Sequence, residues 1–281
     1  MKNAIIDIGS NSIRLFWNGE KPHENTQLAE DLIHTGRLKK EAIERTVNAI
    51  EMLANKAKSE GAYKVYAFAT EAVRAAENRE EFISRVKEVV DEFELVPAEK
   101  EALLGFNGAY PGSGTVAVLD VGGASSELAV GNENGLLYAH SMPLGSVRLK
   151  DYSQDEKERF GYAKQRVTEY GNVPKFDKLI SIGGSSSVLA AVHLGLVPYD
   201  SKRVHGLTMT KEELQGTIDR ILSVPVEERV NIKGLHPKKT VVGPVGGMIV
   251  LAAMEYLGVD RIELSEKDNL EGYAMYRGIE V

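Results

Sequence analysis

Apolar residues occur along this chain in two patterns, as short uninterrupted runs and as runs with helical spacing. In the first third of the chain, the short runs predict strands at residues 4–6, 13–17, 64–69 and 94–96. Residues 41–59 carry the helical pattern, with apolar side chains on one face at Ile43, Val47, Ile50, Leu53 and Ala57. Strands mixed with helices in this way are typical of α/β domains.

Two helix starts are indicated by capping patterns. Asn78 is followed three residues later by Glu81, and Thr210 is followed in the same way by Glu213, which is the spacing of a capping box. The helix predicted after Asn78 would carry four apolar residues on one face, Phe82, Val86, Val89 and Phe93. We therefore expect the Asn78 and Thr210 side chains to cap these two helices.

The strand pattern starts again after Pro111-Gly112-Ser113-Gly114, which is the best candidate for a hinge. Further strands are predicted at residues 115–120, 127–130, 136–141, 178–182 and 261–265, and an apolar helix at 245–257. This second series repeats the architecture of the first without close similarity of sequence. A chain of 281 residues is long enough for two domains.

Composition narrows the classes of function. The formal net charge of −7 disfavours broad binding to nucleic acid or to a membrane surface. The chain has no cysteine, which excludes disulfides, thiolate metal sites and cysteine nucleophiles. Residues 1–3 lead directly into a strand and leave no room for a signal peptide, and the uncharged stretch at 179–199 contains glycines, serines and a proline. We expect a soluble cytoplasmic protein.

Two strand ends carry the most informative motif. The first strand leads into Asp7-Ile8-Gly9-Ser10-Asn11-Ser12, and a later one ends in Asp120-Val121-Gly122-Gly123-Ala124-Ser125-Ser126-Glu127. Glycine lets the backbone bend sharply and lets phosphate oxygens approach the N–H groups, while hydroxyls add donors. A carboxylate beside such a turn needs a divalent cation, for which Mg²⁺ is the best match. Two such loops predict two halves that clamp a phosphorylated substrate.

Three other places have two interpretations each. The loop Ile182-Gly183-Gly184-Ser185 is either an anion site at a helix N-terminus or a tight turn. Arg74 is either a fork that binds phosphate or a partner in a surface salt bridge. Glu99 and Glu101 are candidates for a general base, and solvated glutamates at a helix start are the alternative. The P-loop and dinucleotide fingerprints are absent, as are histidine pairs with zinc-binding spacing.

Taken together, these motifs resemble the exopolyphosphatase / guanosine pentaphosphate phosphohydrolase family, within the actin-like ATPase and sugar-kinase superfamily. The matching blocks follow the family's order and are residues 7–15, Ala69-Thr70-Glu71-Ala72-Val73-Arg74 with Asn78, Glu99-Lys100-Glu101-Ala102 with Leu104, residues 120–128, residues 143–149, the Gly183-Gly184 loop and residues 204–208. They extend over nearly the whole chain, and it is their combination that is specific.

The resemblance implies two actin-like (ribonuclease H-like) α/β domains with an interdomain cleft. The first domain would be residues 1–111, with a C-terminal helix at about 269–281 packed back onto it, and the second would be residues 112–268. The resemblance also implies a phosphohydrolase that removes terminal orthophosphate from inorganic polyphosphate or guanosine pentaphosphate, with Mg²⁺ or another divalent cation as cofactor. A homodimer is compatible with this interpretation.

The same resemblance implies roles for individual residues. The catalytic glutamate of the family falls on Glu101, which would orient and deprotonate the attacking water. Asp120 and Glu127, with Asp7 as a third candidate, would hold the metal or its waters. The remaining site residues would bind phosphoryl oxygens, and they are Ser10, Asn11, Ser12, Arg74, Gly122, Gly123 and Ser125.

The chain departs from the family pattern at three places. Ala124 replaces the usual third glycine of the second loop, Leu103 replaces an arginine, and residues 269–272 lack the arginine of the corresponding family segment. Two alternatives to a phosphohydrolase stay open. One is a kinase or ATPase of the same superfamily, with the Gly183-Gly184 loop as its nucleotide site. The other is a low-activity sensor of guanosine tetra- and pentaphosphate.

Overall fold

The computed structural model describes residues 2–281, which fold into two units. One unit consists of the residues up to Leu104 together with Asn269–Val281, and the other is Gly105–Asp268. The division falls inside the helix α5 (Ala98–Ala109), whereas the sequence pattern placed a boundary after residue 111. Each unit is built around a single β-sheet, so the protein has the α/β fold that the sequence predicts.

The first unit has a five-stranded sheet in the order β3-β2-β1-β4-β5. Its strands are β1 (Ala4–Ile8), β2 (Ser12–Phe16), β3 (His23–Asn25), β4 (Val65–Ala69) and β5 (Glu92–Leu95). Its helices, besides the start of α5, are α1 (Leu32–Thr35), α2 (Lys40–Ser59), α3 (Glu71–Ala75), α4 (Arg79–Val89) and α12 (Asn269–Arg277). β1 is antiparallel to β2 and parallel to β4.

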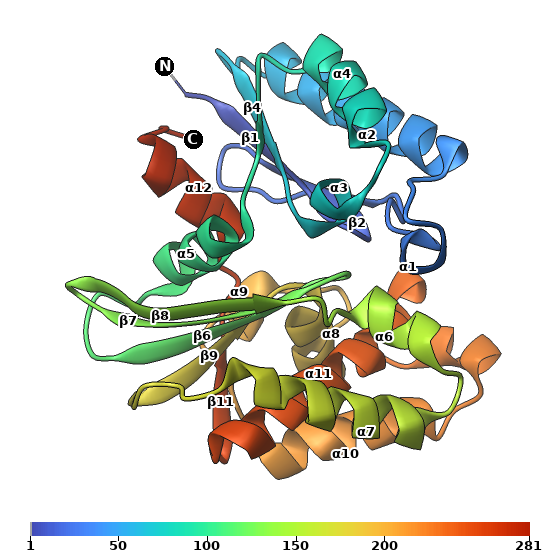
Figure 1. Ribbon diagram of the computed structural model, residues 1–281, viewed down its shortest axis with the longest axis vertical. Coiled ribbons are helices and arrows are strands. Elements are labelled where there is room, and N and C mark those ends of the chain that lie inside the picture. Colours follow the sequence, from blue (N-terminus) through green and yellow to red (C-terminus); the bar gives the residue numbers. More distant parts are fainter. Residues whose placement is uncertain (1) are drawn as a thin grey trace. The chain divides into compact units, whose positions relative to one another are not determined.

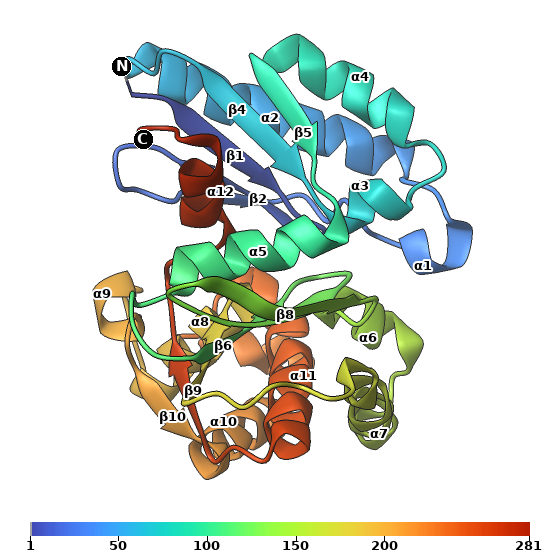
Figure 2. The same cartoon turned by 60° about the vertical axis from the view of Figure 1, so that its left-hand side comes forward.

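The two faces of this sheet are covered by different helices (Figure 2). On one face, Ile6 packs in a core that includes Ile50 of α2 and Phe82 of α4. On the other face, Ile5 belongs to a smaller core in which the rings of Phe68 and Tyr273 are stacked with their centroids 4.5 Å apart. Successive strand residues point to opposite faces, so neighbouring isoleucines of β1 enter separate cores.

The second unit has a six-stranded sheet in the order β10-β11-β9-β6-β7-β8. Its strands are β6 (Val116–Val121), β7 (Ser126–Asn132), β8 (Gly135–Met142), β9 (Lys178–Ile182), β10 (Thr208–Thr210) and β11 (Arg261–Leu264). Its helices are α6 (Ser146–Tyr152), α7 (Glu156–Arg166), α8 (Gly184–Leu194), α9 (Ser201–Val204), α10 (Lys211–Leu222) and α11 (Val242–Leu257), with short 3₁₀ helices at Val167–Tyr170, Val226–Asn231 and Pro237–Lys239.

The apolar helix α11 is the centre of the second unit's helical layer. It contacts α6, α7, α8 and α10, and these helices surround it (Figure 1). Every residue from Gly243 to Met254 is buried, which explains why its apolar residues are not confined to one face. No helix within residues 2–281 combines the length and apolar character that crossing a membrane requires.

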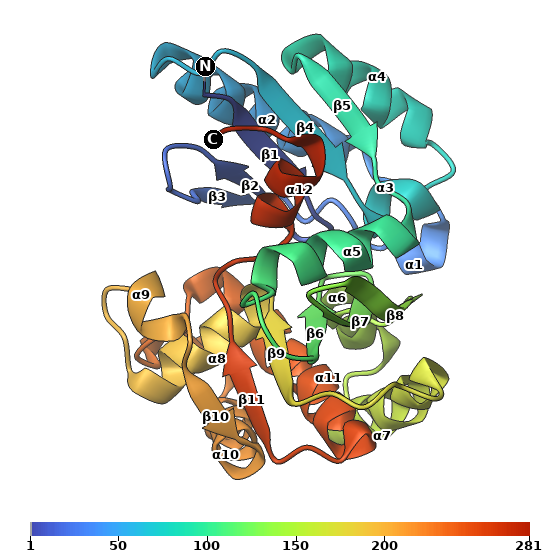
Figure 3. The same cartoon turned by 90° about the vertical axis from the view of Figure 1, so that its left-hand side faces the viewer.

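Both sheets contain the same arrangement of five strands, visible for each sheet in Figure 3. The order β3-β2-β1-β4-β5 in the first unit corresponds to β8-β7-β6-β9-β11 in the second. In both, the first strand has an antiparallel neighbour on one side and a parallel neighbour on the other. The predicted repeat of architecture is therefore confirmed.

The two predicted helix caps have different outcomes. The capping box of Thr210 and Glu213 is present, with the hydroxyl of one and the carboxylate of the other each accepting a backbone N–H bond. Asn78 occupies the predicted N-cap position before α4, but its side chain makes no cap hydrogen bond, so that part of the prediction is wrong. Its amide instead accepts from the N–H of Leu38 at 2.8 Å and donates to the Leu38 carbonyl at 3.0 Å. Asparagine offers a donor and an acceptor together, which suits it to pinning a passing backbone.

Candidate functional site

The loop after β1 is a tight turn that brings together three predicted phosphate-binding residues, Ser10, Asn11 and Ser12. The Gly9 N–H donates to the Ser12 carbonyl at 3.1 Å. A Cβ added to Gly9 would lie 2.9 Å from that carbonyl oxygen, so this position requires glycine. The Asn11 side-chain amide donates to Asn25 of β3 at 3.2 Å, which fixes the tip of the turn.

The loop after β6 has the same construction. The Gly122 N–H donates to the Ser125 carbonyl at 3.0 Å. The carbonyls of Gly122 and Gly123 accept backbone bonds from Ser146 and Val147, at 2.9 and 2.8 Å, where α6 begins. The segment that contains Gly145 thus supports the loop from one side. The sequence analysis did not predict this role for the segment.

Close approach between these two segments depends on glycine at position 145. A Cβ there would lie 2.4 Å from the Gly123 carbonyl carbon, a separation that real Cβ atoms do not show. Ala124 itself is accommodated without backbone strain, because its φ is not positive. Among the described residues, neither the Gly123 nor the Ala124 amide has a hydrogen-bond acceptor. These two amides are therefore available to an anion.

Asp120 and Glu127 are brought side by side by strand pairing. They are direct partners in the antiparallel register of β6 and β7, so their side chains emerge on the same face. Glu127 is only 2% exposed and accepts a hydrogen bond from the Ser141 hydroxyl at 2.7 Å. Two carboxylates in this position repel each other, and a cation between or beside them would remove that cost.

The carboxylates of Asp120 and Glu127 also affect the buried Tyr170. The Tyr170 hydroxyl donates a hydrogen bond to the Ser126 hydroxyl at 3.1 Å. Burial raises the pKa of Tyr170, and the Glu127 and Asp120 carboxylates raise it further. The tyrosine therefore stays protonated and remains a hydrogen-bond donor beneath the second loop.

The donor set of Asp120 and Glu127 fits a magnesium ion. Mg²⁺ is commonly held by one or two carboxylates, with waters and substrate phosphates completing an octahedral shell. Within residues 2–281, no group of three or more His, Asp or Glu side chains is placed to hold a metal by itself.

Asp7, the third predicted metal ligand, has a different neighbour. Its carboxylate accepts hydrogen bonds from Nε and Nη2 of Arg14, at 3.1 and 2.5 Å. Arg14 is the direct partner of Asp7 in the register of β1 and β2, as Glu127 is of Asp120 in β6 and β7. A fixed guanidinium therefore neutralises Asp7, and its role in metal binding stays a prediction.

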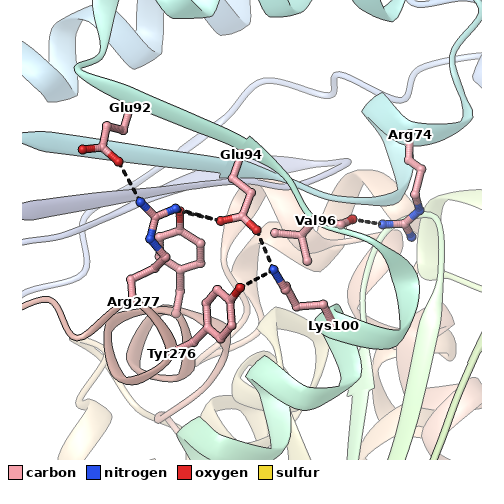
Figure 4. A network of polar contacts seen from close by, with 8 residues as sticks. Arg74, Glu92, Glu94, Val96, Lys100, Tyr276 and Arg277 are labelled. Carbon is pink, nitrogen blue, oxygen red and sulfur yellow. Dashed lines mark hydrogen bonds and ion pairs between the residues drawn. The ribbon is translucent and has the colours of Figure 1, made fainter.

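Two predicted site residues lie in contact with each other. They are Arg74 of α3, the predicted phosphate ligand, and Glu101 of α5, the predicted catalytic base. Nη1 and Nη2 of Arg74 lie 3.3 and 3.2 Å from Oε2 of Glu101. Nη1 also donates to the Val96 carbonyl at 2.5 Å (Figure 4), and Nη2 donates to Glu71 at 2.8 Å. The sequence analysis gave Glu71 no role at the site. Glu71 lies three residues before Arg74 on a helix, and side chains at this spacing meet.

Glu101 and Glu99, the two candidates for the base, have different environments. Glu101 is buried, whereas Glu99 is exposed at the start of α5. Lys100 lies between them and is bound by Glu94 at 2.8 Å and by the Tyr276 hydroxyl at 2.5 Å (Figure 4). Lys100 donates one hydrogen bond to Glu94 and one to Tyr276. These bonds, the one to Glu94 most of all, raise the pKa of Lys100, so it stays charged and holds this turn in place.

The third loop lies next to Asp120. Gly183 adopts a φ of +91°, and a Cβ there would be 2.7 Å from Oδ1 of Asp120. Gly184 opens α8, and a Cβ at Gly184 would be 3.4 Å from Nζ of Lys239. The tight turn is thus present, while anion binding at this helix N-terminus stays a prediction.

The segment that lacks the expected arginine near the C-terminus has a packing role. Leu270 is fully buried, and a Cβ at Gly272 would lie 1.8 Å from the Leu104 carbonyl oxygen. Glu271 forms an ion pair with Lys21 at 2.7 Å. These contacts attach α12 to the first unit.

The sequence model of the Ppx/GppA phosphatase family matches residues 20–275 of this chain. The chain belongs to this family. Superposition on Ppx/GppA crystal structures confirms the α/β fold that the resemblance implied.

Among its relatives in the Ppx/GppA family is the exopolyphosphatase 2 of Mycobacterium tuberculosis, which is 27% identical over 97% of this chain and 97% of that protein. The bifunctional 3-dehydroquinate synthase/phosphatase of Fusobacterium nucleatum is 31% identical over 99% of this chain. This chain spans only 46% of the Fusobacterium protein. The crystal structure of the Aquifex aeolicus Ppx/GppA member superposes with a TM-score of 0.80 at 27% identity, covering 99% of this chain and 97% of that one.

Proposed function

We propose that this chain is a phosphohydrolase that releases terminal orthophosphate from inorganic polyphosphate or guanosine pentaphosphate. The observation that carries the proposal is the contact between the Arg74 guanidinium and the buried Glu101 carboxylate, at 3.2 Å. Membership of a phosphatase family and the name of the Mycobacterium relative support it. A cation that binds phosphate beside a carboxylate that accepts a proton is the minimal set for hydrolysis of a phosphoanhydride.

In the proposed reaction, Glu101 accepts a proton from water while the water oxygen bonds to the terminal phosphorus. The phosphoanhydride bond breaks, and its electron pair goes to the leaving phosphate oxygen. Arg74 binds oxygens of the phosphoryl group that is transferred. The hydroxyls and amides of the two loops, from Ser10, Asn11, Ser12, Gly122, Gly123 and Ser125, supply further donors.

The proposed cofactor is Mg²⁺ or another divalent cation, held by Asp120 and Glu127. When bound, such a cation neutralises charge on phosphate oxygens. The fit rests on the paired carboxylates of β6 and β7 and on the two loop amides without an acceptor. Asp7 is retained as a weaker candidate ligand because Arg14 already neutralises it.

The proposal also includes a cytoplasmic location, no nucleic-acid or membrane partner, and a homodimer as the assembly to be tested. The formal net charge of −7 supports the absence of a nucleic-acid or membrane-surface partner. The phosphorylated end of a substrate remains compatible with that charge, because the donors lie in local turns and on single arginines.

The test is release of orthophosphate from polyphosphate, guanosine pentaphosphate and ATP, measured side by side with and without Mg²⁺. Release that requires Mg²⁺ and is lost in Glu101→Gln but kept in Glu99→Gln would support the proposal. Transfer of phosphate from ATP to a second substrate would indicate a kinase instead. Tight binding of guanosine tetra- or pentaphosphate without turnover would indicate a sensor.

A further inference from the structure

Arg74 binds two carboxylates. Its two terminal nitrogens make four hydrogen bonds, to the Val96 carbonyl, to Glu71 and twice to Glu101. Nη2 is thus shared between Glu71 and Glu101. A phosphoryl oxygen that binds to Nη2 has to displace one of these two acids.

Glu71 is the acid that can leave. The side chains of Glu71 and Arg74 are 18% and 20% exposed, whereas that of Glu101 is 7% exposed. Without Glu71, the Val96 carbonyl and Glu101 would still hold Arg74 in its present position. Glu71 binds Nη2 at 2.8 Å, closer than Glu101 at 3.2 Å, and its side chain is the more exposed of the two acids.

We propose that Glu71 is a positioning residue that competes with phosphate for Arg74, an inference that rests on the proposed function. In the unliganded protein, the Glu71 carboxylate accepts a hydrogen bond from Nη2 of Arg74. When a polyphosphate end binds, one of its terminal phosphoryl oxygens takes the place of the Glu71 carboxylate on Nη2. No covalent bond changes in this exchange.

The exchange would discriminate between anions by charge. A polyphosphate end carries several phosphate groups whose remaining oxygens contact other donors, so it displaces a carboxylate more readily than a lone orthophosphate does. Glu71 would then weaken the binding of the product more than that of the substrate. The class of ligand is an oligophosphate with at least two linked phosphates.

The experiment is titration calorimetry with inorganic tripolyphosphate and with orthophosphate, in the presence of EDTA so that no turnover occurs. Glu71→Gln removes the competing charge and nearly keeps the shape. We expect roughly 5- to 50-fold tighter binding of tripolyphosphate, and a larger gain for orthophosphate. The gain should shrink as salt is raised, because the groups are partly exposed.

Two further variants separate competition from a loss of structure. Glu77→Gln removes the same charge from an exposed glutamate that pairs with Arg37 at 3.5 Å, and it should change affinity less than about 2-fold. Glu71→Asp restores the charge and should bind within about 3-fold of the wild type. Unchanged or weaker tripolyphosphate binding in Glu71→Gln would overturn the proposal.

The outcome is independent of the proposed hydrolysis. If Glu71→Gln tightens binding while the wild type releases no phosphate from any substrate, the proposed function fails and the role of Glu71 stands. If the wild type hydrolyses polyphosphate while Glu71→Gln leaves both affinities unchanged, the proposed function stands and the role of Glu71 fails.

Discussion

The two loops that follow β1 and β6 have the same backbone construction and opposite electrostatics. Each turn is closed by a glycine N–H that donates to a serine carbonyl three residues later, from Gly9 in one and Gly122 in the other. The strand that follows places Arg14 opposite Asp7 in the first unit, whereas in the second it places Glu127 opposite Asp120. The first pair therefore joins a carboxylate to a guanidinium, whereas the second pair places two carboxylates opposite each other.

This difference shows that backbone geometry and charge are set by separate residues. The turn depends on glycine and on main-chain hydrogen bonds, which the two units share. The charge depends on one cross-strand neighbour. Two carboxylates about 4 Å apart repel by about 4 kcal/mol at an effective dielectric of about 20. In a repeated structural element, one residue can thus decide whether an acid faces an opposite charge or a like charge.

The largest effect is expected from Glu101→Gln, which tests whether the first unit supplies the base. The variant keeps the shape of the side chain and its position beside Arg74 but cannot accept a proton. Turnover of polyphosphate should fall roughly 10²- to 10⁴-fold. Phosphate release under saturating substrate measures this, with Glu99→Gln as the matched control. Unchanged turnover would mean that Glu101 is not the base.

The next effect directly compares the two carboxylate environments. Glu127→Gln should weaken binding of Mn²⁺ or Mg²⁺ by roughly 10²-fold, because half of the acidic pair is lost. Asp7→Asn should change metal affinity less than about 3-fold, because Arg14 already neutralises Asp7. Calorimetry or Mn²⁺ paramagnetic resonance would measure both, with the exposed Glu133→Gln as control. Equal losses in the two variants would contradict the asymmetry.

A smaller effect is expected from the support of the second loop. Gly145→Ala places a methyl group 2.4 Å from the Gly123 carbonyl carbon and should lower the free energy of unfolding by roughly 1–3 kcal/mol. Gly161→Ala makes the same chemical change in α7, where nothing lies within 4 Å of the new Cβ, and should raise stability by about 0.5–1 kcal/mol. Urea denaturation measures both. The same sign in both variants would refute the packing argument.

The smallest effect is expected at Glu94, which forms ion pairs with Lys100 and Arg277 in the first unit. Burial acts to raise the pKa of Glu94, but hydrogen bonds from Lys100 and Arg277 outweigh it and hold the pKa below its ordinary value. The stabilisation is therefore complete above the ordinary glutamate pKa of about 4.3 and is lost as the pH falls through the lower folded-state value. Glu94→Gln should cost about 1 kcal/mol at pH 7 and less than half of that at pH 3.

Urea denaturation of the Glu94→Gln variant at pH 7, 5 and 3 would measure this dependence. Glu88→Gln is a suitable control, since Glu88 is exposed on α4, and it should change the free energy of unfolding by less than about 0.5 kcal/mol at each pH. A Glu94→Gln cost that does not decline on acidification would show that the pairs contribute by packing rather than by charge.

Much of the fold could be predicted from the sequence because it depends on local patterns. The apolar spacing of α2 and the capping box of α10 are confirmed, since both are decided within a few residues. Asn78 could not be predicted correctly, because its partner Leu38 lies forty residues away. Phe93 belongs to β5 rather than to the preceding helix, which ends at Val89, so helical spacing alone did not fix that boundary.

The candidate site was predictable where residues adjoin in sequence or in strand register. Asp120 and Glu127 meet because a hairpin pairs them, and a hairpin is visible in the sequence. The roles of Arg74 and Glu101 were predicted only from the family resemblance, and their contact was not predicted, because they lie in separate helices after β4 and β5. The place of Glu71 on Arg74 is a matter of side-chain direction, which neither periodicity nor resemblance specifies.

The helix α12 belongs to the first unit but follows the whole second unit in the sequence. The first sheet is covered on one face by Leu270 and Tyr273, and the Asn3 N–H donates to the Glu280 carbonyl at 2.8 Å. A ribosome translates these C-terminal residues only after the whole of the second unit has left the peptidyl transferase centre. During synthesis the second unit can therefore fold before the first unit is complete, and the apolar residues that Leu270 and Tyr273 cover stay exposed until α12 is made.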